Sequence, residues 1–210
     1  MTKIIYIRHG QTEWNITGRY QGQSDVPLSE LGVEQAKKLA AAFPAPDITA
    51  IYSSNLTRAM TTAKCVADRF GLTVEPRKEL REINFGDWEG LTYDEITGTW
   101  PEALTDFFQR PDRLVIPHGE SFPIVQERAL GCIRELCEKH KGETIAVTAH
   151  GAILRTLLAH ALHMDLRYLW TIRQFNTAVS IVTYNDDNTT AVELVNSTAH
   201  LGAAQPHGKI

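Results

Sequence analysis

The sequence predicts an α/β protein, a three-layer α/β/α sandwich whose central sheet is mainly parallel and carries an antiparallel edge strand. Three observations predict this class. Short apolar segments rich in β-branched residues alternate with longer segments whose apolar residues recur at helical spacing. The strand segments are apolar on both faces, which is typical of parallel strands covered by helices. Near the end, two strand-like segments flank the polar residues 185–188, which is typical of a hairpin.

The first half of the chain contains three predicted strands and two predicted helices. The strands lie at residues 4–7, 50–53 and 72–74, and the helices at residues 30–43 and 56–70. Ser29 is the expected N-cap of the first helix, and Ser54 or Asn55 that of the second, because short polar side chains accept bonds from first-turn N–H groups. We expect Pro76 to stop the third strand. The polar residues 15–25 are expected to form a loop.

The second half adds a helical excursion, two helices, a strand and the hairpin. Ser121 starts a helix that ends near residue 142, followed by a strand at 144–149, a helix at 152–162, and hairpin strands at 178–184 and 190–195. Between residues 80 and 120 the periodicity weakens and aromatic residues gather. We therefore predict a single domain over residues 1–197, with a lid-like excursion at about 83–120 and a polar tail at 198–210.

Composition excludes several classes of function. The 210-residue chain has a formal net charge of −4, whereas nucleic-acid binders usually carry a basic excess, so we expect no nucleic-acid partner. No apolar run is long enough to cross a membrane, so we expect no membrane partner. Three cysteines without Cys-x-x-Cys spacing favour a reducing, cytoplasmic setting. The sequence does not distinguish a monomer from a homodimer.

Common cofactor and nucleophile motifs are missing. The sequence contains no Gly-x-Gly, no Gly-x-x-x-x-Gly-Lys-Ser/Thr and no Gly-x-Ser-x-Gly, which excludes the usual dinucleotide, P-loop and nucleophile-elbow signatures. No cysteine is followed by arginine six positions later, and no His-x-x-x-His or paired cysteines indicate zinc. We therefore predict an activity that needs neither a cofactor nor a metal.

Two strands end in the same dipeptide. Residues 4–10 read IIYIRHG and residues 145–151 read IAVTAHG. In open α/β sheets, ligands bind outside the carboxyl ends of the strands, and parallel strands present those ends at one edge. We therefore expect His9 and His150 to lie at the same edge of the sheet, where Gly10 lets the backbone leave the first strand sharply.

Five sequence blocks, taken in order, point to one family. They are RHGQTEWN from Arg8, QGQSDVPL from Gln21, SSNLTRA from Ser53 with Thr62-Ala63, LREINFGDWEG from Leu80, and VTAHG from Val147. These blocks resemble those of the histidine phosphatase superfamily, the phosphoglycerate-mutase-like group, and the resemblance runs from Lys3 to about His200. The pattern is most similar to the bacterial broad-specificity and α-ribazole-type phosphatases.

The resemblance implies a role for each matching residue. His9 would attack phosphorus and form a phosphohistidine, because a neutral imidazole nitrogen is a nucleophile. Arg8 and Arg58 would clamp the phosphoryl oxygens, as the guanidinium fork suits. Arg58 falls in the first turn of a helix, where the dipole disfavours a cation unless an anion is near. Glu82 would protonate the leaving oxygen and then activate water.

Further residues would complete the site. The resemblance implies that His150 adds a donor to the phosphoryl group, that Asn15 adds an amide donor, and that Gln21 and Gly22 line the approach. The substrate would be a small phosphorylated metabolite. A phosphoglycerate mutase remains an alternative, but residues 90–120 hold six carboxylates against Arg110 and Arg113, a poor clamp for phosphoglycerate. We favour a phosphatase, and leave broad specificity or α-ribazole-5'-phosphate open.

Overall fold

The computed structural model describes residues 1–202 and contains one six-stranded sheet with the strand order β3-β2-β4-β1-β5-β6. The strands are β1 (Thr2–Arg8), β2 (Ile48–Ser54), β3 (Val74–Arg77), β4 (Thr144–Ala149), β5 (Val179–Tyr184) and β6 (Thr190–Ser197). The first four pair in parallel, whereas β5 pairs antiparallel with β1 and β6 antiparallel with β5. The predicted mainly parallel sheet with an antiparallel edge is confirmed.

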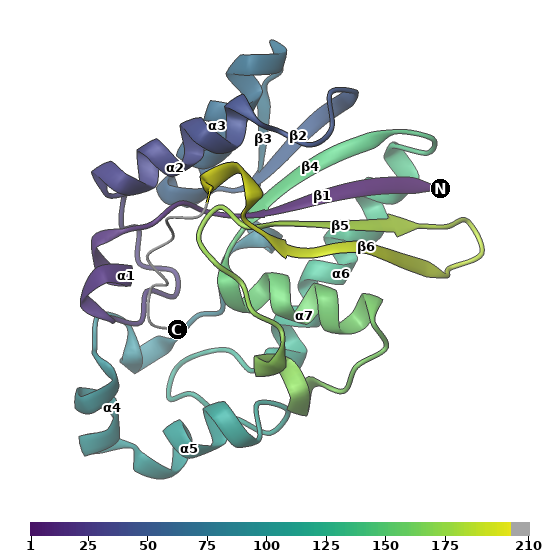
Figure 1. Cartoon of the computed structure of the whole chain (residues 1–210). Helices are drawn as coiled ribbons and strands as arrows, with labels where there is room; N and C mark the ends of the chain where they lie inside the picture. Colours follow the sequence, from purple (N-terminus) through teal and green to yellow (C-terminus); the bar gives the residue numbers. More distant parts are fainter. Residues whose placement is uncertain (203–210) are drawn as a thin grey trace.

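Helices cover both faces of this sheet, which gives the predicted three layers (Figure 1). The long helices are α2 (Glu30–Ala41), α3 (Thr57–Phe70), α6 (Phe122–Lys139) and α7 (Gly151–Ala161). Alternate residues of β1 enter two separate cores, as the period of a strand requires. Ile5 and Ile7 pack with the cluster that includes α2 and α3, whereas Ile4 and Tyr6 pack with the cluster that includes α6 and α7.

The helix caps agree with the sequence in part. Ser29 accepts a hydrogen bond from the N–H of Gly32, as expected for the N-cap of α2. Ser121 occupies the N-cap position of α6 but makes no side-chain cap bond. The predicted cap of α3 is wrong, because Leu56 occupies that position and no side chain caps it. Instead the Asp25 carboxylate, distant in sequence, accepts from the N–H of Thr57 at 2.7 Å.

Two further predictions need correction. Residues 15–17, at the start of the predicted loop, belong to the short helix α1 (Glu13–Thr17), because Thr12 and Asn15 make a capping box and Gly18 ends the helix at φ 70°. The third strand begins at Val74 and continues through Pro76. Proline is tolerated there because β3 is an edge strand, and the N–H that proline lacks is not needed for a ladder on the open side.

The excursion between the third strand and α6 contains α4 (Tyr93–Thr99) and α5 (Pro101–Gln109). Its aromatic residues are largely structural, because Trp88 and Phe107 are buried in the same core as α6 and α7. The rest of the fold includes the 3-10 turns Lys78–Leu80, Gly86–Trp88, Leu166–Thr171 and Ala199–Leu201. The predicted polar tail therefore begins with a turn, and its residues 203–210 lie outside the described part. Over the described residues, no helix is both long and apolar enough to span a bilayer.

Candidate active site

The carboxyl ends of β1 and β4 lie side by side and bring the two His-Gly pairs together. Arg8 is in register with Ala149, and the ring centroids of His9 and His150 are 5.1 Å apart. This confirms that both histidines lie at one edge of the sheet. Gly10 makes a close approach there, because a Cβ at Gly10 would lie 2.5 Å from the carbonyl oxygen of Gly32 in the first turn of α2.

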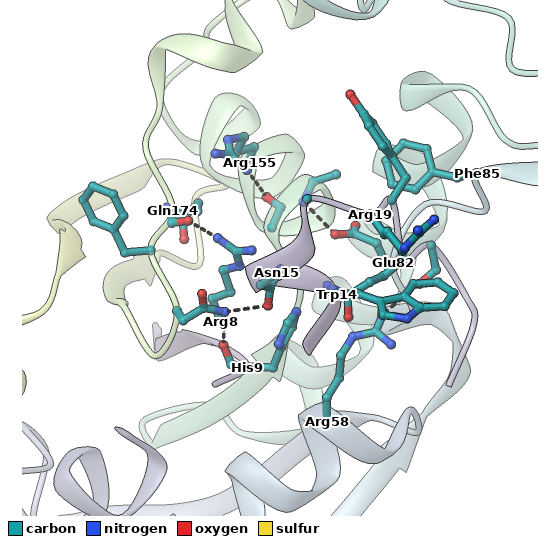
Figure 2. Close-up of a pocket in the computed structure, with 18 of the residues that line it drawn as sticks. Arg8, His9, Trp14, Asn15, Arg19, Arg58, Glu82, Phe85, Arg155 and Gln174 are labelled. Carbon is teal, nitrogen blue, oxygen red and sulfur yellow. Dashed lines mark hydrogen bonds between the residues drawn. The ribbon is translucent and has the colours of Figure 1, made fainter. Parts of the chain in front are cut away.

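A pocket opens at this edge, and seven of the eight predicted site residues line it: Arg8, His9, Asn15, Gln21, Gly22, Arg58 and Glu82. They come from the end of β1, from α1 and the loop after it, from the first turn of α3, and from the segment that follows β3. Figure 2 shows His9 between Arg8 and Arg58, whereas Phe85 lies farther away. Arg155 lies near Arg8, because a Cβ at Gly151 would lie 3.1 Å from Nη1 of Arg155 and 3.4 Å from Nε of Arg8.

The His9 side chain is buried and its tautomer follows from its partner. Nδ1 lies 2.7 Å from the carbonyl oxygen of Gly10. Because a carbonyl only accepts, Nδ1 carries the proton and Nε2 keeps its lone pair. Burial, and then the positive charges of Arg58 and Arg8, lower the pKa of His9 well below its ordinary value. The imidazole is therefore neutral at neutral pH, which a nucleophile requires.

Arg58 is fully buried and its guanidinium is held on three sides. Its Nη1 and Nη2 donate to the carbonyl oxygens of Ser24 at 2.8 Å and Gly22 at 2.7 Å, and Nε donates to Nδ1 of His150 at 3.1 Å. Burial lowers the pKa of Arg58 to about 10, so the group stays charged at neutral pH. Each terminal nitrogen keeps a second N–H, which is available for an anion in the pocket.

His150 lies behind the pocket and does not line it. Because arginine only donates, Nδ1 of His150 accepts from Arg58, and Nε2 carries the proton and lies 2.8 Å from Oγ of Ser54. Both ring nitrogens are therefore engaged within the protein, whereas the family resemblance implied a donor directed at the phosphoryl group. In this arrangement His150 orients Arg58.

Glu82 is buried and its carboxylate lies at the N-terminus of α7. Oε2 accepts from the N–H of Ala152 at 3.0 Å, and Oε1 accepts from the N–H groups of Ile83 and Ile153, also at 3.0 Å. A helix N-terminus presents N–H groups that favour an anion. Because Oε2 accepts only one of these three bonds, it is the oxygen with room for a transferable proton.

Asn15, on α1, and Gln21 and Gly22, in the turn that follows it, line the pocket and are held by local contacts. Gly22 has φ +53°, and a Cβ at this position would lie 2.0 Å from Oε1 of Glu89, so the turn requires glycine. Gln21 accepts from Oγ1 of Thr12 at 3.0 Å, which joins the turn to the start of α1. Oδ1 of Asn15 accepts from Nδ2 of Asn176 at 3.3 Å.

Comparisons with known proteins agree with this geometry. The sequence profile described as "Histidine phosphatase superfamily (branch 1)" matches residues 4–197. The chain belongs to the histidine phosphatase superfamily. Phosphoserine phosphatase 1 of Hydrogenobacter thermophilus is 33% identical over 202 residues, which cover 96% of this chain and 95% of that protein.

Solved structures give the same result. Bacillus stearothermophilus YhfR superposes with a TM-score of 0.91 at 36% identity, over 96% of this chain and all of that chain. A phosphoserine phosphatase variant from Entamoeba histolytica, in complex with phosphoserine, superposes with a TM-score of 0.86 at 30% identity, over 96% and 100% of the two chains. This histidine phosphatase is thus an enzyme of the phosphoric monoester hydrolase class that acts on small metabolites.

Several pocket residues of this histidine phosphatase were not predicted. The structure adds Arg19, Arg155, Arg173, Gln174 and Asn176 to the lining. A signal in the sequence points to Arg155, whereas the positions of Gln174 and Asn176 depend on the order of the strands in the sheet. Arg155 interrupts an otherwise apolar helix, and a buried cation there needs polar partners. Gln174 and Asn176 precede β5, and an antiparallel neighbour of β1 brings its amino end beside the carboxyl end of β1.

Three arginines line the pocket close to His9 or to one another: Arg58 and Arg155 are buried, and Arg8 is half-buried. Arg8, Arg58 and Arg155 form no ion pair with a carboxylate of residues 1–202, and within the same range no cluster of acidic, histidine or cysteine side chains is suited to a metal. Nε of Arg8 is buried without a partner, and its Nη1 donates to the backbone of Gln174. Buried charge without a counter-charge is costly, so the pocket favours an anionic ligand.

The buried histidines predict how stability depends on pH. Burial is the main cause that lowers the pKa values of His9 and His150 well below 6.5, and that of His200 to about 4. Below pH 6.5 the unfolded chain therefore binds protons that the folded chain does not. We expect the free energy of unfolding to fall by about 1.4 kcal/mol per pH unit for each such histidine as the pH drops from 6.5 toward 5.

Denaturant unfolding at half-unit pH steps measures this dependence. The variant His9→Ala lacks one of the three groups, so its unfolding free energy should change less steeply over the same range. An unfolding free energy that is constant or rises on acidification from pH 6.5 to 5, or equal slopes in the two proteins, would contradict the neutral state of buried His9.

Proposed function

We propose that this enzyme hydrolyses small phosphomonoesters through a phosphohistidine on His9, with Glu82 as the proton donor. The observation that supports this best is the environment of His9. Its unprotonated Nε2 belongs to a side chain that lines the pocket, beside two guanidinium groups that have no carboxylate partner within the described part of the chain. A neutral nucleophile beside unpaired cations suits the transfer of a phosphoryl dianion.

The first step transfers the phosphoryl group to the enzyme. The lone pair of Nε2 of His9 attacks phosphorus, and the bond between phosphorus and the ester oxygen breaks. Arg8 and Arg58 donate to the phosphoryl oxygens, where charge is concentrated in the transition state. The departing oxygen takes the proton from Oε2 of Glu82, which leaves Glu82 as a carboxylate held by the N-terminus of α7.

The second step regenerates the enzyme. The Glu82 carboxylate takes a proton from water as the water oxygen attacks phosphorus. The bond between phosphorus and Nε2 breaks, its electron pair returns to His9, and inorganic phosphate is released. His9 needs no change of tautomer in the cycle, because Nδ1 stays bonded to the carbonyl oxygen of Gly10 throughout.

Phosphoserine is the substrate we propose to test first. Two relatives of this enzyme are phosphoserine phosphatases, and the structure of the one from Entamoeba histolytica contains phosphoserine. The pocket offers groups suited to its amino-acid end. Among residues 1–202, Arg155 is a buried cation without a carboxylate partner, and the buried Gln174 amide has no hydrogen-bond partner at either polar atom. A carboxylate can pair with Arg155, and an amide can accept from an ammonium group.

The lining also bears on the mutase alternative. Residues 90–120 contribute only Phe107, so their acidic side chains do not face the substrate. The cations that could hold a carboxylate are Arg19, Arg155 and Arg173, which lie outside that segment. The excursion thus forms an apolar wall of the pocket, and its carboxylates no longer argue against the mutase. The role of the excursion as a lid stays a prediction. The cytoplasmic setting also stays a prediction.

Product analysis tests the proposal. We expect incubation with phosphoserine to release serine and inorganic phosphate, and 3-phosphoglycerate to release phosphate faster than it is converted to 2-phosphoglycerate. The assay is run with and without EDTA, and the two rates should agree. Faster interconversion than release would favour the mutase. Loss of activity in EDTA that a divalent cation restores would contradict metal independence.

A further inference from the structure

The segment that carries Glu82 is fixed to α6 by one arginine. Arg128 lies in the second turn of α6, outside the pocket lining. Its Nη1 donates to the carbonyl oxygens of Glu79 at 2.7 Å and Arg81 at 2.8 Å, and its Nη2 donates to the carbonyl oxygen of Glu82 at 3.0 Å. Three carbonyl groups within four consecutive residues therefore converge on a single guanidinium.

The remaining donors of Arg128 bind Glu120. Nε and Nη2 lie 2.9 Å from Oε1 and Oε2 of Glu120, in a bidentate pair. Guanidinium has five N–H donors in a fixed planar fork, and Arg128 makes five hydrogen bonds. The side chain is therefore fully engaged, and none of its donors is available for a substrate.

Glu120 extends the same contact to the other side of Glu82. Its Oε2 accepts from the N–H of Asn84 at 2.8 Å, and its own N–H donates to the carbonyl oxygen of Asn84 at 2.9 Å. Arg128 and Glu120 thus hold the backbone on both sides of Glu82. We call this pair the 120–128 clamp.

The clamp fixes the direction of the Glu82 side chain. The Glu82 carboxylate must reach the first N–H groups of α7, while its backbone is held from α6. Gln23 adds a weaker contact of 3.3 Å to the same carbonyl oxygen. Proton transfer requires the donor and the leaving oxygen to lie within about 3 Å, so a displacement of the segment near 1 Å would place Glu82 out of reach.

We propose that Arg128 and Glu120 are positioning residues that hold Glu82 in reach of the leaving-group oxygen. This inference rests on the proposed role of Glu82 as the proton donor. The clamp contacts neither the substrate nor His9, so its loss should affect the departure of the leaving group and spare the clamping of the phosphoryl group by Arg8 and Arg58.

Leaving-group dependence separates positioning from general stability. An alkyl ester such as phosphoserine needs a proton on its poor leaving group, whereas the aryl ester p-nitrophenyl phosphate leaves readily without one. We expect Glu82→Gln to lower kcat/KM for phosphoserine at least about tenfold more than for p-nitrophenyl phosphate. Arg128→Lys should show the same preferential loss, about tenfold in the ratio, because a lysine cannot bind three carbonyls and a carboxylate at once.

Two further variants make the test specific. Glu120→Gln keeps the size of the side chain and one acceptor oxygen, and should shift the ratio in the same direction by a smaller factor. Arg110→Lys is the matched control, because Arg110 makes a similar bidentate pair with Asp112 but does not touch residues 79–84. Its ratio should equal that of the wild type. All rates are measured well below each variant's own Tm.

The outcomes of these measurements distinguish the role of the clamp from the role of Glu82. A preferential loss on phosphoserine in Glu82→Gln, Arg128→Lys and Glu120→Gln supports the clamp. Equal losses on both esters in Arg128→Lys and Glu120→Gln, with the preferential loss retained in Glu82→Gln, overturn the clamp and leave the proposed function intact. No preferential loss in Glu82→Gln itself overturns the role of Glu82, and with it the clamp.

Discussion

His9→Ala should abolish turnover, with kcat/KM for phosphoserine reduced by at least about 10⁴-fold. The reason lies in the imidazole and its surroundings. Among residues 1–202, alanine removes the only nitrogen that combines a lone pair, held by the bond from Nδ1 to Gly10, with a position beside Arg8 and Arg58. His150 cannot replace it, because both of its nitrogens are engaged with Arg58 and Ser54.

The loss should coincide with the loss of the covalent intermediate. The wild-type enzyme, mixed briefly with a ³²P-labelled phosphomonoester and quenched in alkaline denaturant, should carry label on a histidine, because the phosphorus–nitrogen bond survives alkali. His118→Ala is the control, since His118 is exposed and its side chain contacts only Asp87 among the described residues. The control should label like the wild type. Labelling of His9→Ala to the same extent as the wild type would show that His9 is not the nucleophile.

Part of the site can be predicted from local sequence, because adjacent parallel strands place their carboxyl-end residues next to each other. Once β1 and β4 are identified as parallel neighbours, their His-Gly ends must meet at one edge, and Arg8 comes with them. Glu82 and Arg58 are less obvious from local pattern, since one follows a turn and the other starts a helix. The five-block resemblance, and not the periodicity, singled them out.

The contacts that sequence did not predict depend on tertiary structure. Asp25 replaces the expected cap of α3 because the turn at Gly22 returns the chain toward that helix. Gln174 reaches the pocket because β5 runs antiparallel to β1. A loop turn decides the first contact, and the order of strands in the sheet decides the second. A single sequence contains the hairpin signal, but not the identity of the strand beside which the hairpin lies.

Arg58→Ala should lower kcat/KM by about 10⁴-fold, through two effects that act together. The first is the loss of a buried cation that faces the phosphoryl group. The second is structural, because the carbonyl oxygens of Gly22 and Ser24 lose their donor and Nδ1 of His150 loses its proton donor. Buried acceptors without partners destabilise the fold, so the Tm should fall as well.

Arg58→Lys distinguishes charge from geometry. Lysine restores one positive charge, but a single ammonium cannot donate to two carbonyl oxygens and an imidazole while it also binds an oxyanion in bidentate fashion. We expect a loss of about 10²-fold in kcat/KM, with weaker inhibition by vanadate, a phosphate analogue. Arg69→Lys is the matched control, because Arg69 lies in the last turn of the same helix and, among the described residues, donates only to backbone carbonyl groups of α2.

The position of Arg58 in the helix also predicts how an anion changes the stability of the enzyme. A cation in the first turn of a helix opposes the helix dipole, and Arg58 is also fully buried and forms no ion pair with any described residue. This placement of a charge costs free energy in the free enzyme, and the cost is offset when a phosphoryl dianion binds. Vanadate should therefore raise the Tm of the wild type and of Arg69→Lys, and raise that of Arg58→Ala far less. An equal rise in all three proteins would mean that Arg58 does not bind the phosphoryl group.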